Sequence, residues 1–363
     1  MKKIQIALVS KEALPVFYII YEFLPDVVYL VGTKETATVM KHIEDVARRH
    51  EIECEQRFTT STDMDECDKV CEEIHQHNDT DVEYMYNLTG GNKLMAFGAL
   101  KCAQRHNAKM VYTDTLSYVD LNTMKRKDLE CLLDTDTIIS LQGQKVREKL
   151  KYVYSEQRTE CAMAVRDFIR QHREVYTELK EEYSINDQLP NTFDFGNVHY
   201  EHNNRGIYVE CNNVEVFSSD YREAHAMLFK GRWWETLVAD AVAKHFGDKT
   251  EIWVNVKFEP NAETEKKIDK NEIDVLVNIG NTLLFIECKS GYFNQDNIYK
   301  LRSVRQTYGS YKSKGCIIEF RRESVKPELE EKARESNIRI IVPNNNFGNL
   351  PQQLNGIINS LNA

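Results

Sequence analysis

The first 120 residues alternate short β-rich runs with amphipathic helical segments. The β-rich runs cover residues 4–9, 27–31, 53–58, 84–88 and 110–112, and the helical patterns cover residues 15–23, 34–50, 63–77 and 93–106. Continuous apolar strands separated by helices form parallel sheets that are covered on both faces. The alternation therefore predicts a doubly wound, Rossmann-like α/β domain, which we place in residues 1–135.

Two loops of this predicted domain have the composition of a ligand site, because ligands of such sheets bind beyond the carboxyl ends of the strands. The first loop contains Ser10 and Lys11, and the second contains Thr89, Gly90, Gly91, Asn92 and Lys93. The glycines let the backbone approach a ligand, Thr89 and Asn92 offer hydrogen bonds, and Lys93 brings a cation to a helix start. These features suit a phosphodiester. The alternative is a tight strand-to-helix turn that Asn92 caps.

Two common nucleotide-binding motifs are absent from the sequence. It contains neither G-x-G-x-x-G nor G-x-x-x-x-G-K-[ST], so ordinary dinucleotide cofactors and P-loop NTP hydrolysis are poorly supported. A Rossmann-like sheet without these motifs favours a sensor domain over a dehydrogenase. Residues 136–190 follow as a highly charged helical stretch without a chemical constellation, and we interpret them as a helical connector.

The strongest pattern in the C-terminal half is a predicted β-hairpin. Two β-rich runs, 271–279 and 282–289, are separated by Gly280-Asn281, a two-residue turn. If Ile279 faces Thr282, then Asp274 lies directly opposite Glu287, with Cβ atoms about 4.5–5.5 Å apart.

Lys289 projects from the same face as Glu287, because it is two residues farther along the strand. Two facing carboxylates repel each other unless a cation or a proton lies between them, and a hard divalent ion with oxygen ligands is the natural solution. The alternative is a surface cluster in which Lys289 neutralises both acids. The neighbouring Leu276, Leu283 and Phe285 argue against an exposed face.

A third acid precedes the hairpin in a helical segment. Glu235 borders an apolar stripe that includes Trp234 and Leu237, so it can be partly buried and point toward the carboxylate pair. Taken alone, it reads more simply as an ordinary helix acid.

The charge of the chain is negative overall but unevenly distributed. The net charge is −10, and residues 1–190 account for most of it, with 25 basic against 33 acidic residues. A bulk positive field for nucleic acid is therefore absent. Residues 300–322 form a basic stretch in which Glu319 is the single acid. Such a stretch is often a solvated helix face.

Other features indicate a soluble, cytoplasmic protein. The longest apolar stretch, residues 13–31, is interrupted by Pro15, Glu22, Pro25 and Asp26, so no segment is expected to span a bilayer. The apolar run near the start is too short for a signal peptide. Nine cysteines without C-x-x-C spacing argue against structural zinc.

The acids and the lysine carry a family resemblance. A helix Glu, then Asp, then Glu-x-Lys on paired strands, here Glu235, Asp274 and Glu287-Cys288-Lys289, resembles the PD-(D/E)xK nuclease superfamily, although Ile273 replaces the usual Pro. The N-terminal half is similar to CRISPR-associated Rossmann-fold (CARF) sensor domains. Together, a CARF domain, the connector and a restriction-endonuclease-like domain in residues 191–363 resemble the CARF-fused nucleases of type III CRISPR defence.

The resemblance implies a cytoplasmic homodimer that binds cyclic oligoadenylate, most often cyclic tetra-adenylate, as an allosteric activator. The loops with Ser10 and Lys11 and with Thr89 to Lys93 would hold this ring. Asp274, Glu287 and Glu235 would bind Mg²⁺ or Mn²⁺, and Lys289 would complete the catalytic set.

The resemblance also gives the basic stretch a role in binding single-stranded DNA or RNA. On a helix that begins near residue 297, Tyr299, Arg302 and Gln306 share one face that can contact a strand. The expected activity is metal-dependent cleavage of single strands and nicking of DNA. Two alternatives stay open: a constitutive restriction or repair nuclease, and a non-catalytic sensor or regulator.

Overall fold

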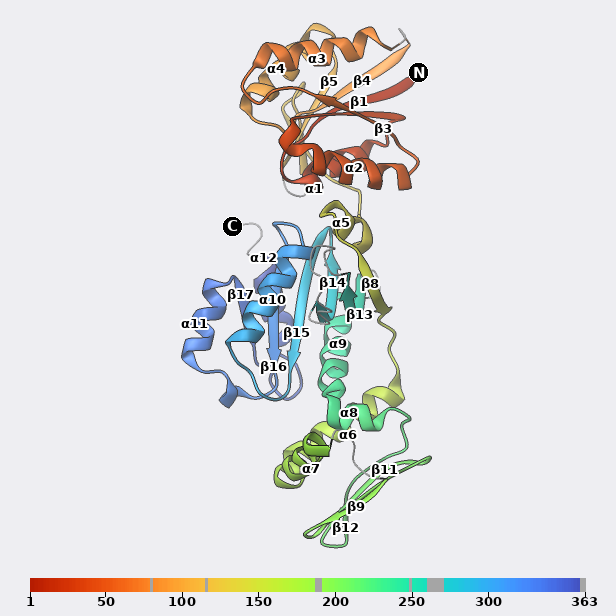
Figure 1. Cartoon of the computed structure of the whole chain (residues 1–363), viewed down its shortest axis with the longest axis vertical. Helices are drawn as coiled ribbons and strands as arrows, with labels where there is room; N and C mark the ends of the chain where they lie inside the picture. The colour runs from red at the N-terminus through yellow and green to blue at the C-terminus, as the bar shows by residue number, and fades with distance from the viewer. Residues whose placement is uncertain (79–80, 115–116, 187–190, 248–249, 260–270, 360–363) are drawn as a thin grey trace. The chain divides into compact units, whose positions relative to one another are not determined.

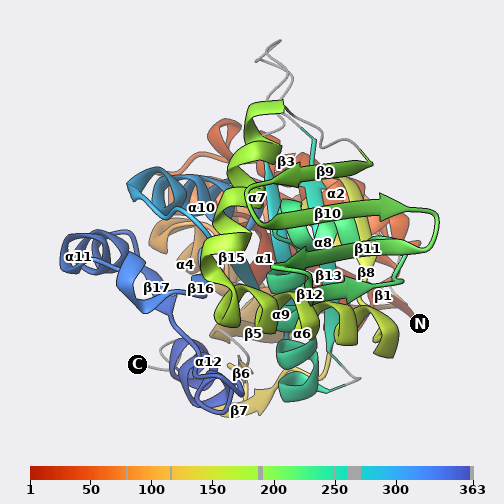
Figure 2. The same ribbon diagram turned by 90° about the horizontal axis from the view of Figure 1, so that it is seen from below.

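The computed structural model describes residues 1–78, 81–114, 117–186, 191–247, 250–259 and 271–359. The chain forms two compact units, shown as ribbons in Figures 1 and 2. The N-terminal unit contains Met1–Val146 and Thr307–Tyr311, and the C-terminal unit contains Arg147–Gln306 and Lys312–Ala363. Each unit has its own sheet and core, and each is described by itself.

The N-terminal unit is built on a seven-stranded sheet with the order β3-β2-β1-β4-β5-β6-β7. The first five strands of this order are parallel, and β6 and β7 are antiparallel additions at one edge. The predicted Rossmann-like domain is therefore confirmed, with two additional antiparallel strands that the alternation did not indicate. The strands are β1 (Lys2–Leu8), β2 (Val27–Gly32), β3 (Glu53–Phe58), β4 (Val82–Asn87), β5 (Lys109–Asp114), β6 (Ser117–Asp120) and β7 (Lys125–Asp128).

Helices cover both faces of this sheet, as its uniformly apolar central strands require. Apolar residues of α3 and α4 pack on one side of β1 and β2, in a cluster that includes Cys71, Ala99 and Ile6. Helices α1, α2 and α5 contact one another and lie across the sheet from α3 and α4 (Figure 1). The helices are α1 (Ala13–Phe23), η1 (Lys34–Thr36), α2 (Ala37–Arg49), α3 (Met64–Gln76), α4 (Lys93–Arg105) and α5 (Thr135–Leu141).

The segment that we interpret as a helical connector is divided between the two units. Helix α5 packs against α2, so the N-terminal unit continues past residue 135 to Val146. The next segment, β8 (Val146–Lys151), is a strand rather than a helix and forms an edge of the C-terminal sheet. Helices α6 (Glu156–Gln171) and α7 (Arg173–Asn186) then belong to the C-terminal unit. The sequence of β8 does not indicate a strand, because an edge strand tolerates exposed charged residues and these replace the usual apolar alternation.

The C-terminal unit has a six-stranded mixed sheet with the order β17-β16-β15-β14-β13-β8. Strand β14 is antiparallel to both of its neighbours, β13 and β15, and β15, β16 and β17 are parallel. The start of β14, which carries Asp274, therefore lies at the same end of the sheet as the carboxyl ends of β15 and β16. The strands are β13 (Glu251–Phe258), β14 (Glu272–Ile279), β15 (Thr282–Lys289), β16 (Lys314–Glu319) and β17 (Ile338–Ile341).

A large core lies between this sheet and the helices on one of its faces. Val275, Val277, Leu284 and Ile286 pack there against α9, whose Trp234 is also part of the core. The helices are α8 (Ala224–Lys230), α9 (Arg232–Phe246), α10 (Gln295–Tyr308), η2 (Arg322–Ser324), α11 (Pro327–Glu335) and α12 (Leu350–Asn359).

A second sheet in the C-terminal unit packs against α6, α7 and α8. It is a four-stranded antiparallel meander with the order β12-β11-β10-β9. Its Tyr200, Val209 and Phe217 are buried against Phe168 and Leu228 of the helices. The strands are β9 (Thr192–Phe195), β10 (Val198–Asn203), β11 (Gly206–Cys211) and β12 (Val214–Ser219). Among the described helices, none has both the length and the apolar content that crossing a membrane requires.

Gly90 supplies a stability test of the N-terminal unit. A Cβ at this position would lie 2.0 Å from the carbonyl oxygen of Leu8 and 2.9 Å from the Ser10 nitrogen, so both backbones would have to move. We expect Gly90→Ala to lower the free energy of unfolding by about 1–3 kcal/mol, the usual cost of overpacking. Thermal unfolding followed by far-UV circular dichroism measures this loss.

Gly356 provides the matched control. It lies on the exposed side of α12, and a Cβ added there would have no heavy atom within 4 Å. Gly356→Ala should therefore raise stability by up to about 1 kcal/mol through its higher helix propensity. Equal stability changes in the two variants would contradict the close approach at Gly90.

Candidate functional site

The hairpin of β14 and β15 has the predicted register. Val275 pairs with Ile286 and Ile279 with Thr282, as the two-residue turn requires. Gly280 and Asn281 both have positive φ, 53° and 71°, which is typical of the turns that fit the twist of a hairpin. Asp274 and Glu287 are thus the next facing positions beyond Val275 and Ile286.

The face that carries the two acids is buried. Leu276, Leu283 and Phe285 have no exposed surface, and Glu287 is only 2% exposed. The alternative of a solvated surface cluster is therefore wrong, because its acids would have to be accessible to water. Two carboxylates in such a place are unfavourable unless other groups compensate their charge.

The two carboxylates have different partners. Asp274 Oδ2 accepts a hydrogen bond from the backbone N–H of Cys288 at 2.6 Å. Glu287 Oε1 lies 2.7 Å from the ammonium nitrogen of Lys289 and 3.6 Å from that of Lys300. Glu287 Oε2 is buried, and no described residue forms a hydrogen bond with it. Glu287 Oε2 is therefore available to a ligand.

The start of α9 brings Glu235 to the same end of the sheet, where the carboxyl ends of β15 and β16 lie. The Trp234 indole N–H donates to the carbonyl of Ile318 in β16 at 2.9 Å, and the rings of Trp233 and Trp234 pack against Phe320 at 4.8 and 5.2 Å. The backbone N–H of Phe320 in turn donates to the carbonyl of Lys289. Glu235 is thereby held in the first turn of α9, beside the ends of β15 and β16.

The three acids form one electrostatic cluster. Burial, followed by the Glu287 and Glu235 carboxylates, raises the pKa of Asp274 well above its usual range. Burial is also the main cause that raises the pKa of Glu235 to about 7, and Glu287 adds to it. Glu235 therefore lies close enough to the hairpin acids for their charges to change one another's pKa. This is the position that the sequence analysis expects for Glu235.

Lys289 stays positively charged within this cluster. Burial lowers the pKa of its ammonium, but the charge and hydrogen bond of Glu287 and the charge of Asp274 outweigh burial and raise it. Lys300 of α10 is a second cation, which the sequence pattern placed only in the basic stretch. It was missed because the face that α10 turns toward the sheet depends on tertiary packing.

Glu319 is a further buried acid that the sequence pattern did not assign to the site. It ends β16, pairs with Lys289 in the parallel ladder and is completely buried. Burial raises the pKa of its carboxyl to about 7. The sequence signal was present, since Glu319 is the single acid of the basic stretch and follows the apolar residues 315–318.

The predicted face of α10 lies on the surface. Tyr299, Arg302 and Gln306 are all exposed, and the Tyr299 ring lies 5.9 Å from the Lys332 ammonium of α11. The basic stretch is not one surface either. Arg305 is buried, and its guanidinium donates to the carbonyl oxygens of Ser313 and Ser336.

A cavity of about 390 Å³ opens beside the acid cluster. Glu235, Asp274 and Asn255 line it, together with Arg158 and Arg232. The donor set of Asp274, Glu235 and the unpartnered Glu287 Oε2 consists of carboxylate oxygens, which suit Mg²⁺ or Mn²⁺. The residues present therefore fit the metal that the sequence analysis expects.

The two N-terminal loops lie together at the carboxyl ends of β1 and β4. Gly90 lies against the backbone of Leu8 and Ser10, and Gly91 has a φ of 71°. The order β2-β1-β4 places both loops where the strand order reverses, the usual ligand position in doubly wound sheets. Lys11 and Lys93 are exposed there.

Some polar groups of these loops already have structural partners. The Thr89 hydroxyl donates to Asn87 Oδ1 at 2.6 Å and accepts from the backbone N–H of Thr113. Asn92 caps α4 by accepting from the Met95 N–H at 3.0 Å. The capped turn is thus present, and a ligand would rely more on Lys11, Lys93 and the glycine backbone than on the Thr89 proton.

Glu235 makes the stability of the metal-free protein depend on pH. Below pH 4.5, its usual value, the carboxyl is protonated in both the folded and the unfolded state. Between pH 4.5 and about 7 only the unfolded state releases the proton readily, so folding loses up to about 3 kcal/mol as pH rises. We expect Glu235→Gln to raise the unfolding temperature in EDTA at pH 8 but not at pH 4.5.

Glu335→Gln is the matched control, because this acid is exposed and pairs with Lys332 on the surface of α11. Its difference from the parent protein should vary little between the two pH values. A pH-independent difference for Glu235→Gln would show that its carboxyl is not held in the buried cluster.

Comparisons with known proteins support both units. A model of the Card1 CARF domain matches residues 4–142, and a model of the Card1-like endonuclease domain matches residues 221–359. No curated protein matches the sequence of this chain.

Solved structures share the fold at low sequence identity. Can2 from Sulfobacillus thermosulfidooxidans, in complex with cyclic tetra-adenylate, is similar with a TM-score of 0.75 and 17% identity, over 98% of this chain and 99% of that chain. VC1899 from Vibrio cholerae has a TM-score of 0.72 and 15% identity, over 99% and 97%. A type III CRISPR defence DNA nuclease activated by cyclic oligoadenylate has a TM-score of 0.57 and 18% identity, over 88% of this chain but 45% of that chain.

These matches confirm the resemblance drawn from the acid set and the glycine loop. The two matched ranges together span well over half of the chain. The chain belongs to the CARF-domain nucleases, with a Card1 CARF domain followed by a Card1-like endonuclease domain.

Proposed function

We propose that the protein is a metal-dependent endonuclease of type III CRISPR defence, and that cyclic tetra-adenylate is the cyclic oligoadenylate that activates it. Its substrates are single-stranded DNA or RNA, and it also nicks DNA. The observation that carries this proposal is the unpartnered, buried Glu287 Oε2 beside the carboxylates of Asp274 and Glu235. A buried carboxylate oxygen without a hydrogen-bond donor is costly, and a divalent cation bound to it would remove that cost.

Asp274, Glu287 and Glu235 would hold Mg²⁺ or Mn²⁺ at this position. A divalent ion bound there supplies Lewis acidity and a more acidic water. The hydrogen bond from the Cys288 N–H fixes the orientation of Asp274, and the aromatic contacts of Trp233 and Trp234 fix the first turn of α9. The acids are therefore preorganised before a substrate arrives.

Lys289 would act as a cation and not as a general base. Its raised pKa keeps the ammonium protonated at neutral pH, so it can donate a hydrogen bond to the attacking water or to a phosphate oxygen. Charge that develops on the phosphate is then stabilised at no further cost of ordering. Lys300 is close enough to Glu287 to assist in the same way.

The CARF unit would bind the activator through Ser10, Lys11 and the loop from Thr89 to Lys93. No described residue forms an ion pair with Lys11 or Lys93, and Can2, which is similar over nearly its whole length, holds cyclic tetra-adenylate. A two-fold symmetric ring suits a homodimer that presents the same loops from both subunits. Leu94 and Phe97 on α4, 42% and 54% exposed, supply apolar surface beside the loop for such a dimer.

The homodimer would couple activator binding to cleavage because the ring favours one arrangement of the subunits. We further place the protein in the cytoplasm, since all nine cysteines are free, as is usual for proteins of reducing compartments. A constitutive nuclease and a non-catalytic regulator are the competing functions, and cleavage assays distinguish them.

The decisive experiment is cleavage of labelled single-stranded DNA and RNA with Mn²⁺, with and without cyclic tetra-adenylate. We expect cleavage only with the ring, and a loss of at least about 100-fold in Glu287→Gln, which removes a charged metal ligand. Glu335→Gln, an exposed acid on α11, should cleave like the parent protein.

Cleavage without the ring would support the constitutive nuclease, and ring binding without cleavage would support the regulator. Lys93→Ala tests the sensor separately. It should raise the ring concentration needed for half-maximal activation while leaving the maximal rate unchanged, whereas Lys69→Ala, an exposed lysine of α3, should change neither.

A further inference from the structure

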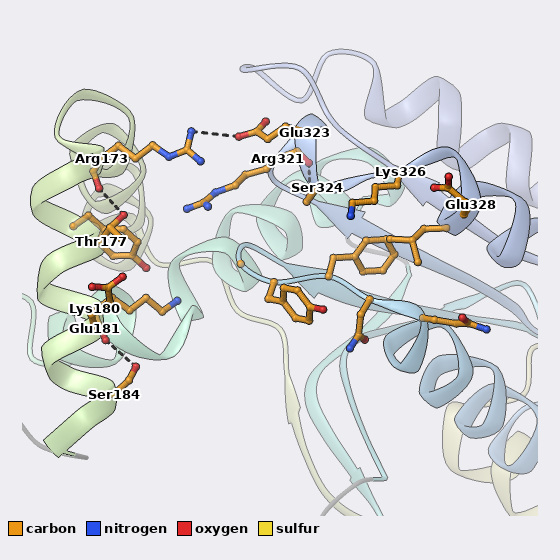
Figure 3. Close-up of a pocket in the computed structure, with 17 residues that line it drawn as sticks. Arg173, Thr177, Lys180, Glu181, Ser184, Arg321, Glu323, Ser324, Lys326 and Glu328 are labelled. Carbon is orange, nitrogen blue, oxygen red and sulfur yellow. Dashed lines mark hydrogen bonds and ion pairs between the residues drawn. The ribbon is translucent and has the colours of Figure 1, made fainter.

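Figure 3 shows a large pocket of the C-terminal unit. Its volume is about 990 Å³, and its walls come from α7, from the loop between β15 and α10, and from the segment around η2. The pocket begins at Gly291, two residues after Lys289, so the two are at most about 7 Å apart along the chain.

The walls of the pocket carry four cations and three acids, the acids being Glu181, Glu323 and Glu328. Arg173 pairs with Glu323 at 3.4 Å. Among the described residues, none forms an ion pair with Lys180, Arg321 or Lys326. Figure 3 shows the side chains of Lys180 and Arg321 extending from opposite walls into the space between them. Unpaired cations that converge on one cavity form a binding site for an anion.

Lys180 is held in this position in spite of an electrostatic cost. Burial, followed by the charge of Arg321, lowers the pKa of its ammonium. Helix α7 cannot shift to move Lys180 away from Arg321, because the Tyr176 hydroxyl donates to the carbonyl of Leu228 and Leu179 is completely buried. A phosphate between Lys180 and Arg321 would remove the repulsion between the two cations.

Arg321 links the pocket to the acid cluster. It follows Phe320, whose backbone N–H donates to the carbonyl of Lys289 at 2.8 Å. A nucleic-acid strand advances about 3.4 Å per nucleotide when stacked. If one phosphate of a strand lies at Lys289, the phosphate one or two nucleotides farther along the strand therefore lies in the pocket.

An exposed aromatic ring completes the site. Tyr292 borders the pocket and is 84% exposed, which gives its ring no structural role in the core. Proteins that bind single strands without sequence preference combine a cationic groove with such rings, on which bases stack. The bases of a duplex are already stacked and paired, so a duplex cannot use Tyr292 without being opened.

We propose that this pocket binds the backbone of a single-stranded substrate next to the scissile phosphate, with Lys180 and Arg321 on a phosphate and Tyr292 stacked on a base. The proposal rests on the nuclease function above and assigns to it a preference for single strands. The positioning residues lie on α7, on the β15–α10 loop and after β16, outside the predicted face of Tyr299, Arg302 and Gln306.

The test measures binding of a labelled six-nucleotide oligodeoxythymidine to the full-length Glu287→Gln protein, which does not cleave. Lys180→Ala and Arg321→Ala should each weaken binding about tenfold, and each should reduce the slope of log K against log salt by about 0.7. Lys244→Ala and Arg334→Ala, exposed residues of α9 and α11, are the controls and should change neither quantity.

Tyr292 gives a second signature. Tyr292→Ala should weaken binding without changing the salt slope, and Tyr292→Phe should restore it, because stacking requires only the ring. In the cleaving protein, Lys180→Ala should raise KM for single strands and leave kcat nearly unchanged.

The outcomes separate the two proposals. Unchanged binding and KM in the Lys180→Ala and Arg321→Ala variants would overturn the pocket and leave the nuclease function intact. Strand binding that depends on both residues, in a protein that cleaves nothing, would support the pocket and overturn the nuclease function. Equal competition by thymidine monophosphate at the same nucleotide concentration, or an equal loss of duplex binding, would overturn the single-strand assignment.

Discussion

The arrangement of the C-terminal unit depends on the repulsion among three carboxylates that the fold holds close together, Glu287 almost fully buried and the other two partly buried beside a cavity. Asp274 and Glu287 face each other at the end of a hairpin, and Glu235 approaches from the first turn of α9. Burial raises the pKa of both Glu235 and Asp274, and the charge of Glu287 raises both further. The free energy that this arrangement costs has to come from the surrounding structure.

Three features of the surrounding structure supply that compensation. The register of the hairpin is enforced by the packing of Val275, Ile286 and their neighbours on α9, since a shift by one residue would exchange this face with the face that carries the acids. The Trp234 indole is tied to β16. Lys289 and Lys300 offset part of the negative charge at Glu287. A bound divalent ion would offset the remaining negative charge of the three carboxylates, so metal binding would also stabilise the folded protein.

The sequence predicted most of what depends on local pattern and little of what depends on packing between distant segments. The strands and helices of the N-terminal sheet follow from their periodicity, and the hairpin register follows from Gly280-Asn281. The antiparallel strands β6 and β7, the edge strand β8 and the meander of β9 to β12 escaped prediction. Strands β7 and β8 are strongly charged, and charged edge strands lack an apolar two-residue pattern. Lys300, Glu319 and Lys180 were missed for a related reason: only the tertiary structure shows which helix face or strand end meets the acids.

The net charge of −10 constrains how such a protein can engage a polyanion. At physiological ionic strength, charges farther apart than about 8 Å are largely screened, so the acidic surface exerts little repulsion on a strand at a distance. Binding must then come from short-range interactions. The cations Lys180 and Arg321 line a pocket, where salt screens their charge less than on an open surface. A rigid duplex presents its phosphates on a cylinder and cannot enter such a recess without deforming, whereas a flexible single strand can. Selectivity for single strands would then follow from the recessed position of the cations and not from their number.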